Sequence, residues 1–326
     1  MIELVRRLGG ARVVVVGDLI ADEYVYGRVA RVSREAPVLI LEYDSTEIVP
    51  GGAGNAANNV AALGGQVTLV SLIGRDEPGR RAERALLRRV DRGSLVRPAG
   101  FLTPVKTRIL AGGIHSAKQQ VVRIDRLSPR PITDEQRTAV ARAAHKVLGK
   151  ADAVLISDYG SGLVTPALAR DIRGRLGGRS VPVLVDSRYA LTRYRGLTAC
   201  APNESEVEQA LGLRIGDNLR VLERAGRQML ARTRMQAVVI TRGSRGMAVF
   251  ENGKKTVHIP IFGSDQVTDV TGAGDTVMAA LTLALAAGAS LEQAAQLANV
   301  AGGLVVMKRG TATVSGPELR KVLGSG

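Results

Sequence analysis

With 45% hydrophobic residues, 38 glycines and 12 prolines in a chain of 326 residues, the composition is that of a globular protein and excludes a disordered one. No apolar run approaches the roughly 20 residues that cross a bilayer, and residues 1–11 lack the apolar core of a signal peptide. Cys200 is the single cysteine, which excludes a disulfide framework, so we expect a soluble cytoplasmic protein without a membrane partner.

The net charge of +15 raises the question of a nucleic-acid partner. The basic residues are scattered along the chain, for example as Arg80-Arg81 and Arg88-Arg89 in predicted amphipathic helices. Aromatic residues make up 3% of the chain and offer no platform on which the bases of a single strand could stack. We therefore expect no nucleic-acid partner, and an arginine-rich surface that attracts anionic substrates is the simpler explanation.

The first predicted strand, residues 11–18, is rich in valine and ends in Asp18, a pattern typical of a buried parallel strand. Residues 19–50 have the composition of strands and not of a crossover helix, and residues 103–127 make a second excursion of the same kind. We predict that the two excursions together form a small β-sheet lid on a single domain covering residues 1–326.

A glycine-rich segment, Gly51-Gly52-Ala53-Gly54-Asn55, lies between the two excursions. Its pattern Gly52-x-Gly54-x-x-Ala57 can pass for a dinucleotide fingerprint, which makes an NAD-dependent oxidoreductase the strongest alternative from another class of chemistry. Such a fingerprint should directly follow the first buried strand, whereas here polar residues and Pro50 precede it. The glycines could also serve only to pack a helix close to the sheet, although several amides at one helix end suit the recognition of a polyol.

From residue 134 onwards, predicted helices alternate with predicted strands. The predicted helices cover residues 135–148, 166–176, 204–211 and 218–231, and the predicted strands cover residues 153–158, 181–186 and 237–241. This alternation implies parallel crossovers and a doubly wound, mostly parallel sheet with helices on both faces. Several strands end in polar residues, so Asp18, Asp158, Asp186 and Asn203 should lie along one edge of the sheet, although each could be only a helix N-cap.

A loop at residues 269–274 precedes an apolar segment, residues 277–288, which predicts the start of a buried helix. The free N–H groups and the dipole at a helix N-terminus favour an anion, and glycines let the backbone close on a phosphate. Asp275 lies in the first turn, where it could be an ordinary cap. Phosphoryl transfer depends on positioning and on stabilised negative charge, and an ionised Asp275 would suit it as a general base.

Asp269 and residues 272–275 resemble the second signature, D-x-x-G-A-G-D, of the PfkB/ribokinase-like family of carbohydrate kinases, and they match at every fixed position. The resemblance implies a ribokinase-like three-layer αβα fold, ATP and Mg²⁺ as cofactors, and phosphorylation of a sugar hydroxyl. It assigns the N–H groups of Gly272, Ala273 and Gly274 to an anion hole and Asp275 to the base that takes the hydroxyl proton. A P-loop kinase is excluded, because G-x-x-x-x-G-K-[ST] does not occur.

Other segments resemble further motifs of this family. Gly51, Gly52 and Asn55 match the first signature, G-G-x-x-x-N, whose residues hold sugar hydroxyls. Asn203 and Glu206 match the N-x-x-E motif, and the resemblance implies that they order Mg²⁺ through water, which suits an ion that keeps most of its water ligands. The resemblance also places five residues along the nucleotide: Thr241, Gly243, Gly246, Asn299 and Gly310.

Over nearly the whole chain, the sequence most resembles the heptose 7-phosphate kinases, which phosphorylate the anomeric hydroxyl of D-glycero-D-manno-heptose 7-phosphate. The residues that carry this resemblance include Gly17-Asp18 with Asp22, Tyr24 and Tyr26-Gly27; Arg31-x-Ser33-x-Glu35-Ala36-Pro37; Lys106-x-Arg108; Gln119-Gln120 with Arg123 and Asp125; and Ser157-Asp158-Tyr159. A phosphorylated sugar needs a cationic clamp, for which Lys106, Arg108 and Arg123 are the candidates. Their alternative role is to keep edge strands from aggregating.

The sequence departs from the heptose kinase pattern at three positions. Ser161 and Arg188 stand where that pattern has lysines, and Ser187 stands where it has a proline. The exact sugar therefore stays open, and another sugar or nucleoside kinase of the ribokinase or fructokinase type is the alternative. Because the chain ends soon after the kinase pattern, we expect a kinase without a nucleotidyltransferase, and exposed lid strands predict a homodimer that pairs through the lid.

The predicted mechanism closes the lid over a small sugar phosphate while ATP and Mg²⁺ lie along the sheet edge. Asp18, Asp22 and Asp158 hold the sugar together with Asn55. Asp275 then takes the proton of the attacking hydroxyl, as a general base does.

Overall fold

The computed structural model describes residues 1–112, 118–128, 130–263, 268–308 and 310–324. Within these residues, a ten-stranded sheet has the order β14-β13-β12-β11-β10-β9-β1-β4-β5, and β6 pairs with β4. Its strands are β1 (Arg12–Gly17), β4 (Gln66–Leu72), β5 (Val90–Asp91), β6 (Leu95–Val96), β9 (Ala153–Asp158), β10 (Val183–Ser187), β11 (Ala199–Cys200), β12 (Ala237–Thr241), β13 (Met247–Glu251) and β14 (Val257–Ile259). The pairs from β12 to β5 are parallel, and β13 and β14 add an antiparallel edge.

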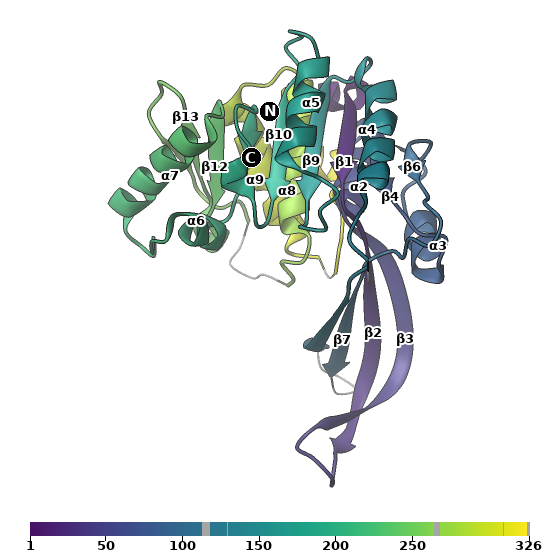
Figure 1. Ribbon diagram of the computed structural model, residues 1–326. Coiled ribbons are helices and arrows are strands. Elements are labelled where there is room, and N and C mark those ends of the chain that lie inside the picture. The colour runs from purple at the N-terminus through teal and green to yellow at the C-terminus, as the bar shows by residue number, and fades with distance from the viewer. Residues whose placement is uncertain (113–117, 129, 264–267, 309, 325–326) are drawn as a thin grey trace.

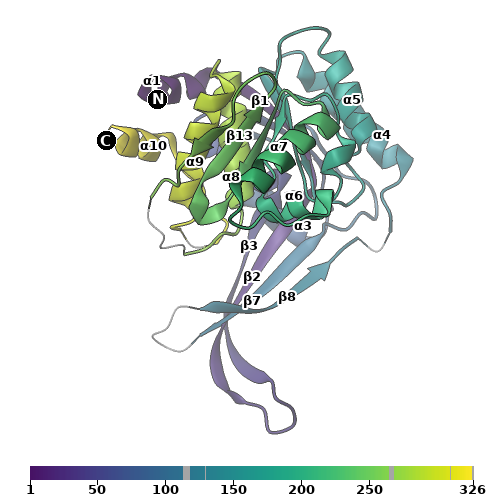
Figure 2. The ribbon, with the colours of Figure 1, turned by 90° about the vertical axis from the view of Figure 1, so that its left-hand side faces the viewer.

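Helices cover both faces of this sheet, as Figures 1 and 2 show. One face carries α1 (Ile2–Arg7), α2 (Ala53–Ala62), α8 (Ala273–Ala286), α9 (Leu291–Val305) and α10 (Gly316–Leu323). The other carries α4 (Asp134–Leu148), α5 (Pro166–Arg175), α6 (Glu204–Leu211) and α7 (Leu219–Thr233). The remaining helices are α3 (Glu77–Arg84) and the short 3₁₀ turns η1 (Leu8–Gly10), η2 (Leu191–Arg193) and η3 (Gly243–Arg245).

The two faces of the sheet are built by the alternation of side chains along each strand. In β1, Val13 and Val15 belong to the core under α2 and α8, whereas Val14 and Val16 belong to the core under α4 and α5. A strand that is buried on both faces has no polar side, which is why its sequence is a continuous run of valine. The predicted three-layer fold with a doubly wound, mostly parallel sheet is confirmed.

A separate four-stranded sheet extends away from this body, at the bottom of Figures 1 and 2. Its order is β3-β2-β7-β8, formed by β2 (Leu19–Val32), β3 (Leu39–Gly52), β7 (Val105–Gly112) and β8 (Gln119–Arg126). The small sheet therefore comes from the two predicted excursions, with β2 and β7 parallel and both outer pairs antiparallel. That it acts as a lid, and that residues 1–326 form one domain, stay predictions.

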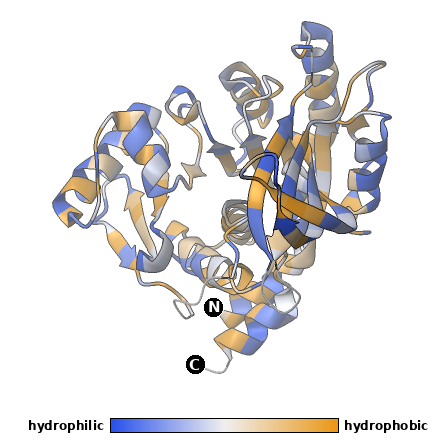
Figure 3. Ribbon diagram, turned by 90° about the horizontal axis from the view of Figure 1, so that it is seen from below, coloured by the Kyte–Doolittle hydropathy of each residue, from blue (hydrophilic) through white to orange (hydrophobic). Residues whose placement is uncertain are grey.

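The small sheet leaves hydrophobic side chains exposed, and the edge strand β8 is exposed along its whole length. Val121, Val122 and Ile124 have exposed fractions of 44%, 47% and 49%. Viewed from below, hydrophobic segments are visible on this sheet in Figure 3. Its free edge and apolar side chains together leave a surface that a further strand could cover.

The structure differs from the predicted elements mainly at their ends. Strand β10 begins at Val183 because Pro182 has no N–H to donate to the ladder, although its carbonyl accepts a bond from Val154. The antiparallel strands β13 and β14 were not part of the prediction, since β14 has only three residues and little alternation. Among the described residues, no helix is both long and apolar enough to span a membrane.

Candidate active site

Strands β1 and β9 lie side by side in the sheet, and the chain leaves them in opposite directions. From β1 the sheet continues to β4 and β5, and from β9 it continues to β10, β11 and β12. Ligands of open α/β sheets bind at such a switch point, beyond the carboxyl ends of the strands. Asp18 follows β1 at this point and accepts a hydrogen bond from the N–H of Tyr159, which follows β9. The Tyr159 hydroxyl in turn donates to Asp275 at the start of α8.

Asp275 lies in the first turn of α8, where its exposed fraction is 4%. Its Oδ2 accepts a hydrogen bond of 2.8 Å from the Asn55 amide, and its Oδ1 accepts one of 3.0 Å from the Tyr159 hydroxyl. The Asn55 oxygen accepts from the Asn59 amide at 3.1 Å, and the Asn59 oxygen accepts from the Thr276 hydroxyl at 2.9 Å. These hydrogen bonds form a connected series from Thr276 through Asn59 and Asn55 to Asp275. The series gives each of the two amides one favourable orientation.

Burial raises the pKa of Asp275 to about 6, against the effect of the two hydrogen bonds from Asn55 and Tyr159. A carboxylate with such a pKa is largely ionised at neutral pH and still basic enough to accept a proton. The geometry therefore suits a general base. Helix α8 fixes the backbone position of Asp275, and the hydrogen bonds from Asn55 and Tyr159 fix the orientation of its carboxylate.

The loop before Asp275 leaves backbone N–H groups for a ligand. Within the described residues, the N–H groups of Gly272 and Gly274 have no acceptor, whereas that of Ala273 donates to the Val270 carbonyl at 3.2 Å. The predicted set of three anion-binding amides is therefore reduced to two in this conformation. Gly272 has a φ of +77°, and a Cβ there would lie 2.6 Å from the Asn55 amide nitrogen, so only glycine suits this position.

A cavity of about 400 Å³ opens in front of these amides, and we call it the α8 cavity. It contains most of the residues predicted to contact the nucleotide or its metal: Asn203, Glu206, Thr241, Gly243, Gly246 and Asn299. Gly310 is not among its lining residues, and its N–H donates to Asp269 Oδ2 at 3.0 Å. Gly310 therefore supports the 269–272 loop, and its predicted contact with a nucleotide stays a prediction.

Asn203 and Glu206 bond to each other as a helix cap. The Asn203 oxygen accepts from the Glu206 N–H at 2.8 Å, and Glu206 Oε2 accepts from the Asn203 N–H at 2.9 Å. Asp186 lines the same cavity, and burial, followed by the charge of Asp275, raises its pKa to about 8. Burial also raises the pKa of Glu206. Burial disfavours the charged form of both carboxylates, and a bound divalent cation would oppose these shifts.

A second cavity of about 440 Å³, the lid cavity, lies between the main sheet and the small sheet. Four basic residues line it: Lys106, Arg123, Arg130 and Arg188. Arg108, the third predicted clamp residue, is not among its lining residues, because its guanidinium is paired with Asp22 at 2.7 Å in a largely buried contact. The opposite charge of Asp22 fixes Arg108 in place. Arg130 and Arg188 line the cavity although they are not among the clamp residues predicted from the sequence.

The residues predicted to hold sugar hydroxyls mostly have partners within the protein. Asp18 accepts bonds from the Tyr159 N–H, the Ser161 N–H and the Ser161 hydroxyl, although it does line the lid cavity. Asp158 accepts from the Gly160 N–H, the Ser187 hydroxyl and the Tyr194 hydroxyl. Burial of these carboxylates is compensated by short loops that follow β9 and β10.

The glycine-rich segment serves packing in this structure. A Cβ on Gly51 would lie 2.2 Å from Asp22 Oδ2, so Gly51 makes room for the Asp22 carboxylate. Gly52 has a φ of +56° where β3 turns into α2. Asn55 has an exposed fraction of 1%, and its amide is directed at Asp275 and not at a cavity. Asn55 therefore differs from its predicted role as a sugar ligand, because the fold brings α2 and α8 together.

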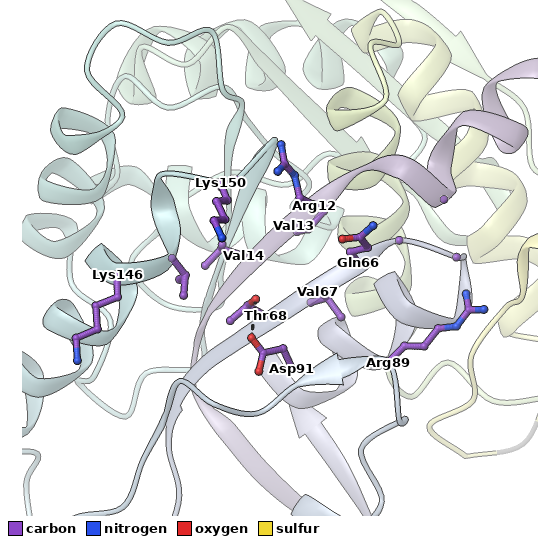
Figure 4. Close-up of a pocket in the computed structure, with 15 residues that line it drawn as sticks. Arg12, Val13, Val14, Gln66, Val67, Thr68, Arg89, Asp91, Lys146 and Lys150 are labelled. Carbon is purple, nitrogen blue, oxygen red and sulfur yellow. Dashed lines mark hydrogen bonds between the residues drawn. The ribbon is translucent and has the colours of Figure 1, made fainter.

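Another hollow, of about 700 Å³, lies at the opposite edge of the sheet, beside the amino ends of β1 and β4. In Figure 4, Lys146 and Arg89 point away from each other, and Thr68 and Asp91 bond across its centre. Arg12 is paired with Asp152 at 2.9 Å. The cationic groups that line this hollow therefore do not converge on one point, as a ligand site requires.

A comparison with protein-family models matches residues 11–318 to the pfkB family of carbohydrate kinases. The chain belongs to this family. Membership makes it an ATP-dependent carbohydrate kinase and confirms the predicted family and class of enzyme. The α8 cavity combines free N–H groups, whose chemistry suits an anion, with Asp275, whose carboxylate suits a base.

Known proteins are similar over nearly the whole kinase. "Bifunctional protein HldE" of Trichlorobacter lovleyi is 40% identical over 318 residues, which cover 97% of this chain and 63% of that protein. "Bifunctional protein HldE" of Geobacter metallireducens is 43% identical over 313 residues, covering 95% and 62%. The structure of Arabidopsis thaliana ribokinase complexed with ribose and ATP has a TM-score of 0.74 at 21% identity, covering 96% of this chain and 99% of that one. The kinase spans less than two thirds of the length of the two HldE relatives.

The fold also explains why the glycine-rich segment is not a dinucleotide fingerprint. In this kinase, α2 follows β3 of the small sheet, whereas a dinucleotide fingerprint follows the first strand of the main sheet. Among the described residues, no three or more His, Cys, Asp or Glu side chains form a group that could hold a metal ion alone. A metal at this site would depend on water and on the phosphates of a nucleotide for most of its ligands.

Proposed function

We propose that this kinase transfers the γ-phosphoryl group of ATP to the anomeric hydroxyl of D-glycero-β-D-manno-heptose 7-phosphate and forms the 1,7-bisphosphate. The reaction would supply precursors of ADP-heptose for cell-surface glycans. The observation that carries the proposal is the lid cavity, because four basic side chains face a hollow of about 440 Å³ that touches the active-site residue Tyr159. A sugar that already bears a phosphate is the class of substrate that such a hollow favours.

The basic residues of the lid cavity differ in how free they are to bind a phosphate. Lys106 lies over the Tyr159 ring, 4.8 Å from its centroid, and burial lowers its pKa. Arg123 is paired with Asp125 at 2.9 Å, so a phosphate would compete with that carboxylate. Among the described residues, Arg130 donates no side-chain hydrogen bond. We assign the 7-phosphate to Lys106, Arg123 and Arg130, and not to Arg108.

The residues of the α8 cavity fit ATP with Mg²⁺. The free N–H groups of Gly272 and Gly274 would receive the γ-phosphate at the N-terminus of α8. Asp186 and Glu206 offer carboxylate oxygens, which are the donors that Mg²⁺ prefers. The pKa of each is raised. When bound, the metal would supply positive charge to the phosphates. Thr241, Gly243 and Asn299 line the part of the cavity available to the nucleoside.

The residues of the chain then divide the work of the transfer. Asn55 and Tyr159 hold the Asp275 carboxylate towards the boundary of the two cavities. Asp275 takes the proton of the attacking hydroxyl as that oxygen bonds to the γ-phosphorus. The bond from this phosphorus to the oxygen that bridges the β- and γ-phosphates breaks, and its electron pair stays on ADP. Such a reaction would take place in the cytoplasm, where ATP and sugar phosphates are available.

The proposal includes a homodimer that forms through the small sheets. Strand β8 is an exposed edge, and its apolar side chains have exposed fractions near one half. Two copies that pair at this edge would bury those side chains and complete the ladder of each sheet. Pairing would also hold the two lids over their substrates.

A panel of acceptors tests the function. Heptose 7-phosphate, fructose 6-phosphate, ribose, fructose and adenosine are each incubated with ATP and Mg²⁺, and ³¹P and ¹³C NMR locate the new phosphate. We expect the highest kcat/KM with heptose 7-phosphate and a product phosphorylated at C1. Preference for an unphosphorylated sugar or a nucleoside would reject the proposed substrate. Transfer to another carbon would reject the proposed position.

A further inference from the structure

The α8 cavity and the lid cavity are separate hollows that share a boundary. Tyr159 and Arg188 line both of them. The α8 cavity contains the base and the free N–H groups, and the lid cavity contains most of the basic side chains. A phosphoryl group that leaves a nucleotide in one cavity for an acceptor in the other must cross this boundary.

Arg188 is the first residue after β10, so the carboxyl end of that strand delivers it to the switch point. Its guanidinium lies over the Tyr159 ring, 5.2 Å from the ring centroid. Lys106 lies over the same ring at 4.8 Å, and Tyr159 donates a hydrogen bond to Asp275. Two cations therefore lie over the ring of Tyr159, the residue that orients the base.

Within the part of the chain that the structure describes, the Arg188 guanidinium forms no ion pair and no hydrogen bond. This contrasts with Arg108 and Arg242, whose guanidinium groups are paired with Asp22 at 2.7 Å and Glu204 at 2.7 Å. A guanidinium that stays unpaired at the boundary of two cavities keeps its five N–H donors for a ligand. The chemistry that such a fork recognises best is a phosphate or phosphoryl group.

We propose that Arg188 is a catalytic residue whose guanidinium contacts the phosphoryl group while it is transferred. During the transfer, the bond from the γ-phosphorus to the bridging oxygen of ATP breaks, and a bond to the acceptor oxygen forms. ADP keeps the electron pair of the broken bond, and Asp275 receives the proton of the acceptor. Negative charge on the equatorial oxygens then lies between the two cavities, where Arg188 stabilises it. This role rests on the kinase activity and not on the identity of the sugar.

The proposal separates the two cations that flank Tyr159. Lys106 lines the lid cavity but not the α8 cavity, so it should contribute to binding of the acceptor. Arg188 lines both cavities and should contribute to stabilisation of the transition state. Arg188→Ala should lower kcat about 10²–10³-fold, as the loss of one preorganised donor does, and change the KM of ATP and of the acceptor less than about threefold. Lys106→Ala should instead raise the KM of the phosphorylated acceptor and change kcat little.

Two measurements do not depend on knowing the sugar. Calorimetric binding of ADP with aluminium fluoride, which imitates the transferring phosphoryl group, should weaken about a hundredfold in Arg188→Ala, while binding of ADP alone stays unchanged. Slow hydrolysis of ATP without any acceptor should fall in parallel. Added guanidinium ion should restore part of the activity of Arg188→Ala, and Arg188→Lys should retain an intermediate rate, because it keeps the charge but loses the planar fork.

Arg193→Ala is the matched control, since Arg193 is an exposed arginine nearby in sequence that lines neither cavity. If the alanine variant at position 188 does not fold, Arg188→Gln carries the same test with a similar side-chain length. The proposal is overturned if kcat and binding of ADP with aluminium fluoride stay within about twofold of the unchanged protein. It is equally overturned if the loss is confined to the KM of the phosphorylated acceptor, because Arg188 would then only bind the substrate.

Discussion

Asp275 shows how a catalytic position conflicts with stability at the scale of one residue. Its carboxylate is buried at the start of α8, and its pKa is raised from 3.8 to about 6. The folded protein therefore holds the proton more tightly than the unfolded chain does. Its unfavourable contribution to stability appears as pH rises above the unfolded pKa and is complete above the folded pKa.

Asp275→Asn should separate the two effects. It should lower kcat by about 10²–10⁴, because the amide cannot accept the proton, and change KM little. At pH 8 it should raise the free energy of unfolding by about 3 kcal/mol, from the difference between 3.8 and about 6, and most of this gain should vanish by pH 4. Urea denaturation at the two pH values and steady-state kinetics measure both. Asp134→Asn, at an exposed residue of α4, should change neither, and equal turnover by Asp275→Asn would reject the base.

The pH profile of kcat tests the same group without a mutation. A base with a pKa of about 6 is protonated below that pH and ionised above it, so kcat should rise with pH through about 6 and level off. The rise should follow the titration of a single group. Tyr159→Phe removes a hydrogen bond that stabilises the charged carboxylate, so it should move the rise to higher pH. A profile that is flat from pH 5 to pH 8 would contradict the assignment.

At the scale of elements, a contact joins the small sheet to the anion-binding loop. Tyr24 in β2 shares a hydrogen bond of 2.6 Å with Thr311, and a Cβ on Gly272 would lie 3.1 Å from the Thr311 methyl group. Tyr24 is almost fully buried, and Arg108 lies over its ring at 5.3 Å. The position of the small sheet is thus transmitted by packed side chains to the first turn of α8.

A double-mutant cycle with Tyr24→Phe and Thr311→Val measures this contact. Each single change should cost about 1 kcal/mol of unfolding free energy, since it leaves a partly buried hydroxyl without its partner. The double change should cost less than the sum of the two, with a coupling of about 0.5–1.5 kcal/mol. If the contact positions the loop, kcat should fall in the same non-additive way. Additive effects on both quantities would show that the two residues act independently.

At the scale of the whole molecule, the exposed edge of the small sheet decides whether two copies associate. Ile124→Lys and Val122→Lys place a charge on β8, so each should shift the protein from dimer to monomer in sedimentation experiments. Activity should fall with the loss of the dimer if paired lids hold the substrate. Leu219→Lys is the control, because Leu219 is similarly exposed on α7, far from the small sheet in Figure 1. A monomer in the unchanged protein would reject the dimer.

Much of the fold follows from patterns that are local in sequence. The valines of β1 and the alternation after residue 134 predict a doubly wound sheet, because a strand buried on both faces has to be apolar throughout. Gly272, Gly274 and Asp275 predict an anion site because free N–H groups at a helix start are a local property. These inferences need no knowledge of which elements become neighbours.

The tertiary structure decided which candidate side chains are free to act. Arg108 and Asn55 have the right chemistry for a substrate, but Asp22 and Asp275 are brought against them from other elements and occupy their polar groups. Among the residues that the structure describes, no ion pair holds Arg188, because the end of β10 places it where two cavities meet. A sequence states which charges exist, but the cancellation of one charge by another depends on distances of a few ångströms that only folding sets.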